Sequence, residues 1–124
     1  MAETLRSNPL ALSEMLLAVD FYLDTPKQIL LVAPRGEKGA ADPLMTVFRE
    51  RFLPNRVFSV VSEGEEQERN ARLVPLLRGK EAAGGRATAY VCENRACGLP
   101  TNDPAEFATQ LLPVKALRVA SGKE

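Results

Sequence analysis

Histidine is absent from this 124-residue sequence, and only two cysteines are present. Without histidine, the chain cannot assemble a Ser-His-Asp or Cys-His catalytic arrangement, or any zinc site that uses imidazole. Two thiols supply at most half of a tetrahedral zinc site. The sequence therefore predicts no catalytic residue of these kinds, no metal site and no cofactor.

The sequence also lacks a net charge and a long apolar run. Lysine plus arginine number 16, aspartate plus glutamate also number 16, and the formal net charge is zero. We therefore expect neither nucleic acid nor an acidic membrane as a partner. No apolar run approaches the ~20 residues that cross a bilayer, and the first residues lack the basic start and apolar stretch of a secretory signal. These features predict a cytoplasmic protein.

What is present is ordinary globular composition. Hydrophobic residues make up 45% and charged residues 26%, which favours a folded chain with one modest core. A chain of this length should remove roughly two-thirds of its unfolded surface from water. We expect a single α/β domain over residues 1–124, with a poorly ordered tail at 114–124.

Three segments are typical of strands: 28–33, 56–61 and 87–92. The first is a continuous apolar run, as in a strand covered on both faces of a parallel sheet. A helix that starts at Asp42-Pro43 and ends before Pro54 joins the first strand to the second, which predicts a right-handed crossover. The sequence therefore predicts an α/β fold: a small three-layer sandwich with a short, mostly parallel three-stranded sheet flanked by helices.

Two further segments have helical features. Residues 72–77 indicate a short helix broken by Pro75. Asp103-Pro104 is typical of a capped helix start, with Glu106 at the position that completes a capping box. The glutamates between 63 and 68 are interpreted as a solvated acidic turn.

The first helix is predicted over 9–23, with Asn8 as its N-cap and Pro9 at its first position. Its wide apolar face is expected to pack on the sheet and comprises Leu12, Met15, Leu16, Val19, Tyr22 and Leu23. The opposite face carries a second apolar stripe, which one small core would not cover. That stripe consists of Leu10, Leu17 and Phe21. Two interpretations stay open: a surface helix, bare or covered by the C-terminal tail, or a docking face for a missing domain or a second copy.

The loop from Pro34 to Gly39 follows the first strand and precedes a helix. Backbone amides and positive charge there suit an anion, which gives one alternative function: a small anion- or nucleotide-binding domain of flavodoxin-like topology. The candidate residues are Arg35, Gly36, Lys38 and Gly39. The spacing matches neither the P-loop nor the dinucleotide glycine pattern, and an ordinary solvated loop is the favoured interpretation.

Cys92 and Cys97 are separated by four residues at the end of the third strand. A turn there would bring the thiols within bonding distance, and Arg95 would favour a thiolate, so a dithiol redox module is a second alternative. The spacing is not that of thioredoxin-type sites, and two reduced structural cysteines are the favoured interpretation. If all three strands are parallel, this segment and the loop at 34–39 share the carboxyl edge of the sheet, where ligands usually bind.

Four segments resemble one known family. They are Ala89–Pro104 with its Tyr-Val-Cys and Asp-Pro elements, the helix end Ala18–Leu23, the junction Phe52–Val57, and Pro75–Lys80. Together they resemble the C-terminal region of thioredoxin-domain-containing proteins related to spermatogenesis-associated protein, a family with bacterial uncharacterised homologues.

The resemblance implies a parent protein with a thioredoxin-like domain, an (α/α)6 barrel of the six-hairpin glycosidase kind, and a C-terminal α/β portion. This chain resembles the last portion alone and has no Cys-x-x-Cys motif. We therefore expect a non-catalytic C-terminal accessory domain. Its expected partners are the thioredoxin-like and barrel portions of its parent, or a second copy, with the first helix packed against the barrel.

Overall fold

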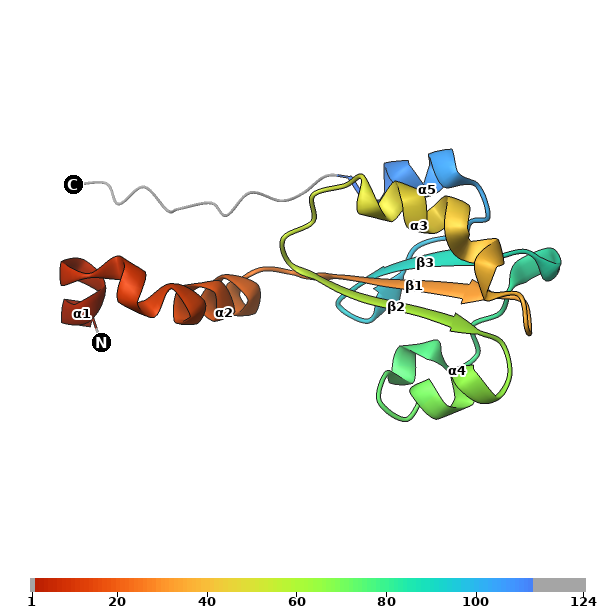
Figure 1. Ribbon diagram of the computed structural model, residues 1–124, viewed down its shortest axis with the longest axis horizontal. Coiled ribbons are helices and arrows are strands. Elements are labelled where there is room, and N and C mark those ends of the chain that lie inside the picture. Colours follow the sequence, from red (N-terminus) through yellow and green to blue (C-terminus); the bar gives the residue numbers. More distant parts are fainter. Residues whose placement is uncertain (1, 113–124) are drawn as a thin grey trace.

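The computed structural model describes residues 2–112, and the tail predicted at 114–124 lies outside this range. Two helices precede the first strand, a helix follows each of the first two strands, and a final helix follows the last two strands (Figure 1). The helices are α1 (Ala2–Ser7), α2 (Ser13–Leu23), α3 (Asp42–Arg49), α4 (Glu65–Asn70) and α5 (Pro104–Gln110), and the strands are β1 (Lys27–Ala33), β2 (Arg56–Ser62), β3 (Thr88–Glu93) and β4 (Ala96–Cys97). Short 3-10 turns occupy Pro9–Leu12, Lys38–Ala41, Pro75–Leu77 and Ala83–Gly85.

β1 is central because its sequence is apolar on both faces. Residues 29–33 are all buried. β1 pairs in parallel with β2 and antiparallel with β3, and β3 pairs antiparallel with the short β4. The strand order is therefore β2-β1-β3-β4.

The predicted three-stranded, mostly parallel sheet is wrong, since only one of the three strand pairs is parallel. The path of the chain after β2 explains the difference. The side-chain amide of Gln67 in α4 donates to the carbonyls of Leu77 (2.8 Å) and Lys80 (2.6 Å), which ties the returning segment to α4. The N–H of Ala82 then donates to Oε1 of Glu63 at 2.7 Å, just past the end of β2. β3 therefore begins beside the carboxyl end of β1 and runs in the opposite direction.

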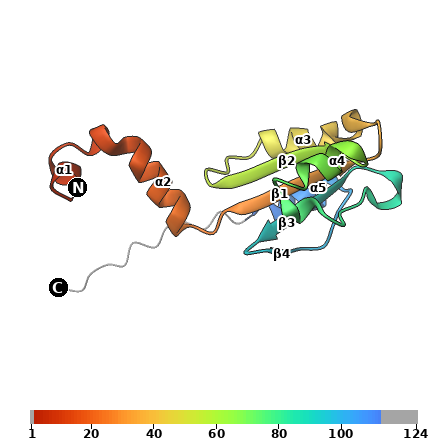
Figure 2. The ribbon, with the colours of Figure 1, turned by 90° about the horizontal axis from the view of Figure 1, so that it is seen from below.

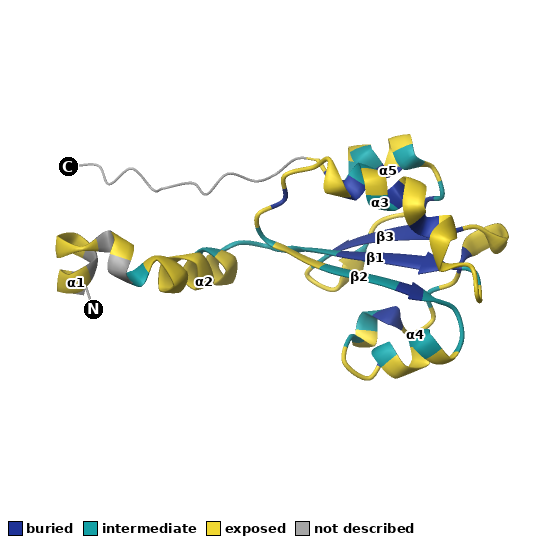
Figure 3. Cartoon of the chain, viewed as in Figure 1, coloured by how far each residue is buried: buried dark blue, intermediate teal, exposed yellow. Residues whose placement is uncertain are grey.

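Successive residues of β1 point to opposite faces of the sheet, and each face has its own apolar core. Ile29 and Leu31 face α3 and α5, where Phe107 is fully buried. Leu30 and Val32 face α4 and the 3-10 turn that contains Leu77. Figure 3 shows buried residues concentrated along the strands and the inner sides of these helices.

α1 and α2 project away from the sheet (Figures 1 and 2). The helix predicted over 9–23 is divided into the 3-10 turn Pro9–Leu12 and α2. The prediction that one face of it packs on the sheet is wrong, because α2 has no buried residue. The physical reason is that both faces of the sheet are already covered by other elements. Asn55 contacts the end of α2, where its amide donates to Asp20 and Asp24, at 2.9 Å each.

Within residues 2–112, no helix combines the length and the apolar character that crossing a membrane requires.

Candidate functional site

The stripe predicted as an interface is exposed, with Leu10 in the 3-10 turn Pro9–Leu12 and Leu17 and Phe21 in α2. Leu10 is 83% exposed, Leu17 68% and Phe21 40%. The face predicted to be buried is also largely open, and its exposed members are Met15, Leu16, Val19, Tyr22 and Leu23. An exposed apolar patch of this extent normally marks an interaction surface. We call residues 10–23 the helix surface.

The loop predicted to bind an anion has its charge matched within the chain. Nζ of Lys38 lies 2.5 Å from Oε1 of Glu66. Arg35 lies against Gly64, since a Cβ added at Gly64 would be 3.1 Å from the guanidinium of Arg35. Gly64 also has a φ of 101°, which strains other residues. No contact of Arg35, Gly36, Lys38 or Gly39 favours an external anion, so anion or nucleotide binding stays a prediction.

Glu66 connects this loop to the end of β2. Its Oε2 accepts hydrogen bonds from the backbone N–H (2.9 Å) and the hydroxyl (2.7 Å) of Ser62. The hydrogen bond from Lys38, followed by those from Ser62, lowers the pKa of Glu66 from 4.5 to about 2. The interpretation of the glutamates as a solvated turn is therefore wrong for Glu66, and also for Glu63, which accepts from Ala82.

Acid should remove the contribution of Glu66 to stability. Its pKa in the folded chain lies below the ordinary value, so the ionised carboxylate stabilises the fold above about pH 4.5, and this stabilisation is lost as the pH falls toward 2. We expect the chain to melt at a higher temperature than the Glu66→Gln variant at neutral pH, and the two to converge near pH 2. Thermal melts over this range, with Glu68→Gln on the same helix as control, measure the effect. A difference independent of pH would contradict it.

Cys92 and Cys97 form a disulfide in the hairpin of β3 and β4. They are paired residues of the antiparallel ladder, with Cα atoms 3.9 Å apart. The two residues of the turn, Asn94 and Arg95, have φ angles of 50° and 66°, as a tight hairpin turn requires. The structure therefore differs from the expected pair of reduced cysteines, because the hairpin places the two side chains opposite each other.

The hairpin and the loop at 34–39 lie at opposite ends of the strands. Cys92 pairs with Gln28, near the start of β1, whereas the loop follows the end of β1. The predicted sharing of one edge is wrong because β3 is antiparallel. The cysteines and the candidate anion loop therefore cannot form one site.

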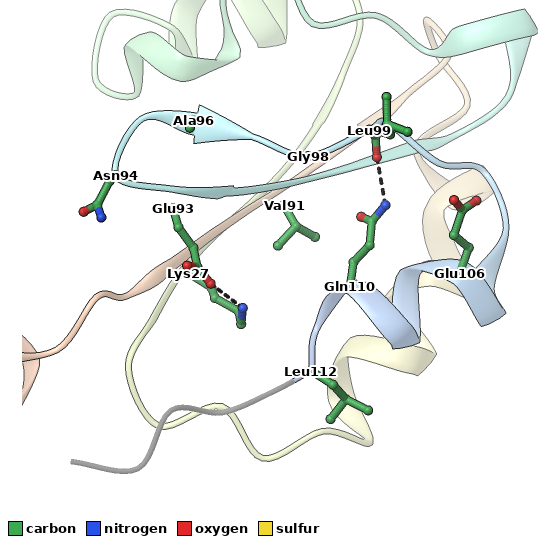
Figure 4. Close-up of a pocket in the computed structure, with 10 residues that line it drawn as sticks. All are labelled: Lys27, Val91, Glu93, Asn94, Ala96, Gly98, Leu99, Glu106, Gln110 and Leu112. Carbon is green, nitrogen blue, oxygen red and sulfur yellow. Dashed lines mark hydrogen bonds and ion pairs between the residues drawn. The ribbon is translucent and has the colours of Figure 1, made fainter. Parts of the chain in front are cut away.

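A hollow of about 730 Å³, which the sequence did not predict, lies beside the hairpin. Figure 4 shows the residues that line it. On its rim, Nζ of Lys27 and Oε1 of Glu93 form an ion pair at 2.5 Å. Gln110 donates from Nε2 to the carbonyl of Leu99 at 2.8 Å, while its Oε1 is buried with no hydrogen-bond partner among the described residues. This hollow offers an apolar wall, an ion pair and one amide acceptor. Within the described residues, no cluster of histidine, cysteine, aspartate or glutamate side chains is arranged to hold a metal.

No family model matches the sequence, and no solved structure matches it. The chain is similar to curated proteins named spermatogenesis-associated protein 20. Identity to the human protein is 34% over 112 residues, covering 90% of the chain and 14% of that protein. The rat protein is 33% identical and the mouse protein 32%, each over 108 residues and 13% of its length.

The chain thus spans about one-seventh of the length of these relatives. A match over 90% of the chain leaves only about twelve residues unmatched. It must therefore include most of α2 as well as the sheet. Most of the helix surface and the sheet therefore fall within the same matched stretch of these longer relatives.

Proposed function

We propose that this chain is a non-catalytic accessory domain of a larger protein similar to spermatogenesis-associated protein 20, and that it packs onto the remainder of that protein through the helix surface. One observation carries the proposal. The part of the chain from β1 to α5, called the sheet domain below, has one apolar core on each face of its sheet. In contrast, α2 exposes large apolar side chains and buries none. This distribution of apolar residues is expected if α2 is covered by the remainder of the larger protein while the sheet domain folds around its own cores.

The remainder of the larger protein suits the helix surface better than a second copy of this chain. In a symmetric pair, two identical helices would cover one face of each other and leave the opposite faces in water. Leu17 and Phe21 lie four residues apart on one side of α2, Leu16 and Tyr22 lie on other sides of it, and all four are exposed. Covering both sides requires several neighbouring elements. The relatives are about seven times longer than this chain and have room for them.

The energy available to this packing is large for a single helix. Burying a leucine or phenylalanine side chain contributes about 1.5–3 kcal/mol. Leu10, Leu17 and Phe21 are already partly covered, so burying the rest of their surface offers roughly 3–6 kcal/mol before the losses of side-chain and rigid-body freedom. Asn55, which donates to Asp20 and Asp24, holds the end of the helix next to the sheet domain.

The proposal includes the architecture that the resemblance implies. The preceding portion would contain a thioredoxin-like domain and an (α/α)6 barrel, and the helix surface would pack against the barrel. The protein would act in the cytoplasm, as its composition predicts. Its reaction and substrate would belong to the larger protein.

The test begins with the genomic neighbourhood of this reading frame. Coding sequence for the preceding portion should lie in frame or adjacent. That portion is expressed separately and titrated with this chain in a calorimeter. We expect binding with a negative heat-capacity change, because apolar surface is buried. Absence of binding to the preceding portion would contradict the proposal.

A further inference from the structure

The disulfide of Cys92 and Cys97 joins two sulfurs in different environments. Cys92 is fully buried, whereas Cys97 is only partly buried. The sequence contains no third cysteine, so the pair cannot exchange with another thiol of the same chain. Any thiol–disulfide exchange must involve an external thiol, and that thiol reaches Cys97 more readily than Cys92.

Backbone hydrogen bonds also hold the segment around the hairpin. The cysteines are five positions apart, and a disulfide that closes so short a loop removes less entropy from the unfolded chain than one that closes a long loop. The N–H of Gly98 donates to the carbonyl of Val91 at 2.9 Å. Ala89 and Thr101 exchange two backbone hydrogen bonds, at 2.8 and 3.1 Å. These contacts keep the segment after β4 in place when the disulfide opens.

A second hollow lies on the face of the sheet that carries α4, and Arg95 of the hairpin turn helps to line it. It encloses about 600 Å³. Val74 and Leu76 line it and, like Cys97, pack against the buried cluster that contains Cys92. Gln28 also lines it and is the ladder partner of Cys92. Oε1 of Gln28 is buried with no hydrogen-bond partner among residues 2–112, and exposed Arg95 supplies a positive charge at the rim.

We propose that the disulfide is an exchange site for a low-molecular-weight peptide thiol that binds in this hollow. An amide N–H of the peptide donates to Oε1 of Gln28, which satisfies a buried acceptor. A carboxylate of the peptide pairs with Arg95, whose charge also stabilises the attacking thiolate. The chemistry of the hollow therefore suits an anionic peptide that carries a thiol.

The reaction balances in two steps. The thiolate of the peptide attacks Sγ of Cys97, the bond between the two cysteines breaks, and its electron pair leaves on Sγ of Cys92, which takes up a proton. This step yields a mixed disulfide of the peptide with Cys97. A second peptide thiolate attacks the sulfur of the bound peptide and releases Cys97 as a thiolate, which is then protonated. Two peptide thiols are oxidised to one peptide disulfide, and the protein disulfide is reduced to two thiols.

Reduced glutathione is the probe, and the whole chain is used. Free thiols are trapped by alkylation and counted by mass spectrometry over time. We expect both cysteines to be reduced while the circular dichroism spectrum stays that of the folded chain. The Arg95→Ala variant should react about two- to fivefold more slowly, as expected for the loss of one partly exposed ionic contact. Arg95→Lys should restore most of the rate, because it keeps the charge at a position of the same backbone conformation.

Two comparisons separate an exchange site from a structural crosslink. Cys92→Ser should gain one glutathione at Cys97 when it is mixed with oxidised glutathione, and Cys97→Ser, whose thiol is buried, should react at least about tenfold more slowly. Arg86→Ala, at an exposed arginine away from the hollow, should leave the rate unchanged. The proposal is overturned if the disulfide resists glutathione while the chain stays folded, if reduction unfolds the chain, or if Arg95→Ala and Arg86→Ala react equally fast.

Discussion

Replacing Leu17 and Phe21 together by glutamate is expected to weaken binding of the chain to the preceding portion of the larger protein by at least about 100-fold. Two effects combine. The apolar contribution of both side chains is lost, and two carboxylates without partners enter a buried interface. A hundredfold loss corresponds to about 2.7 kcal/mol, which is within the range of a single important interface residue.

The control for this double variant is Glu14→Gln on the same helix, since Glu14 is exposed and polar. Binding of the control should change less than threefold. Neither change should alter the thermal stability of the chain by itself, because α2 has no buried residue. Unchanged affinity of the double variant would show that the helix surface is not the docking face.

The second large effect concerns the core on the α5 side. Replacing Phe107 by alanine is expected to lower the free energy of unfolding by about 3–5 kcal/mol, because Phe107 is fully buried and its removal leaves a cavity beside Ile29 and Leu31. The matched variant Phe21→Ala makes the same chemical change on the helix surface. It should lower that free energy by less than about 0.5 kcal/mol in the isolated chain. Urea unfolding curves compare the two.

This pair of variants tests the division of the chain into a self-sufficient sheet domain and an uncovered helix. A similar loss of stability in both variants would contradict the division, since it would mean that Phe21 is buried in the isolated chain. Loss of stability in Phe107→Ala alone would agree with it.

Local patterns in the sequence located most of the elements. The predicted strands at 28–33, 56–61 and 87–92 lie within one residue of β1, β2 and β3. Asp103 caps α5, where its side chain accepts from the N–H of Ala105 at 2.8 Å. The predicted capping box is wrong in one respect, because Glu106 accepts from the hydroxyl of Thr101 instead. These features depend on neighbours in the sequence, which is why they can be predicted.

The direction of β3 depends on contacts that span many residues, and local patterns do not show them. Gln67 reaches Leu77 and Lys80, and Glu63 reaches Ala82, so the chain returns before β3 starts. The interpretation of 72–77 as a broken helix did not predict that the chain turns back here. In the structure only Pro75–Leu77 is helical, as a short 3-10 turn. Because β3 was predicted to run parallel to β1, the cysteines were predicted at the wrong end of the strands.

The candidate sites were predicted unevenly for the same reason. Helical spacing alone puts Leu17 and Phe21 on one side of α2, whereas Leu10 lies in the separate 3-10 turn Pro9–Leu12. The proximity of Cys92 and Cys97 follows from a short turn, and the pair Asn94-Arg95 between Glu93 and Ala96 is the signal for a two-residue hairpin. The orphaned acceptors of Gln28 and Gln110 and the ion pair of Lys38 with Glu66 arise only when distant segments meet.

Hydrogen exchange at the amides of α2 tests the central claim most directly. The measurement compares this chain alone with the same chain bound to the preceding portion of the larger protein. The account predicts fast exchange in the isolated chain, because no other described element buries α2, and exchange slowed at least about 100-fold in the complex. Equal exchange rates in both states, in a complex whose formation is confirmed separately, would contradict the claim that the helix surface is the docking face.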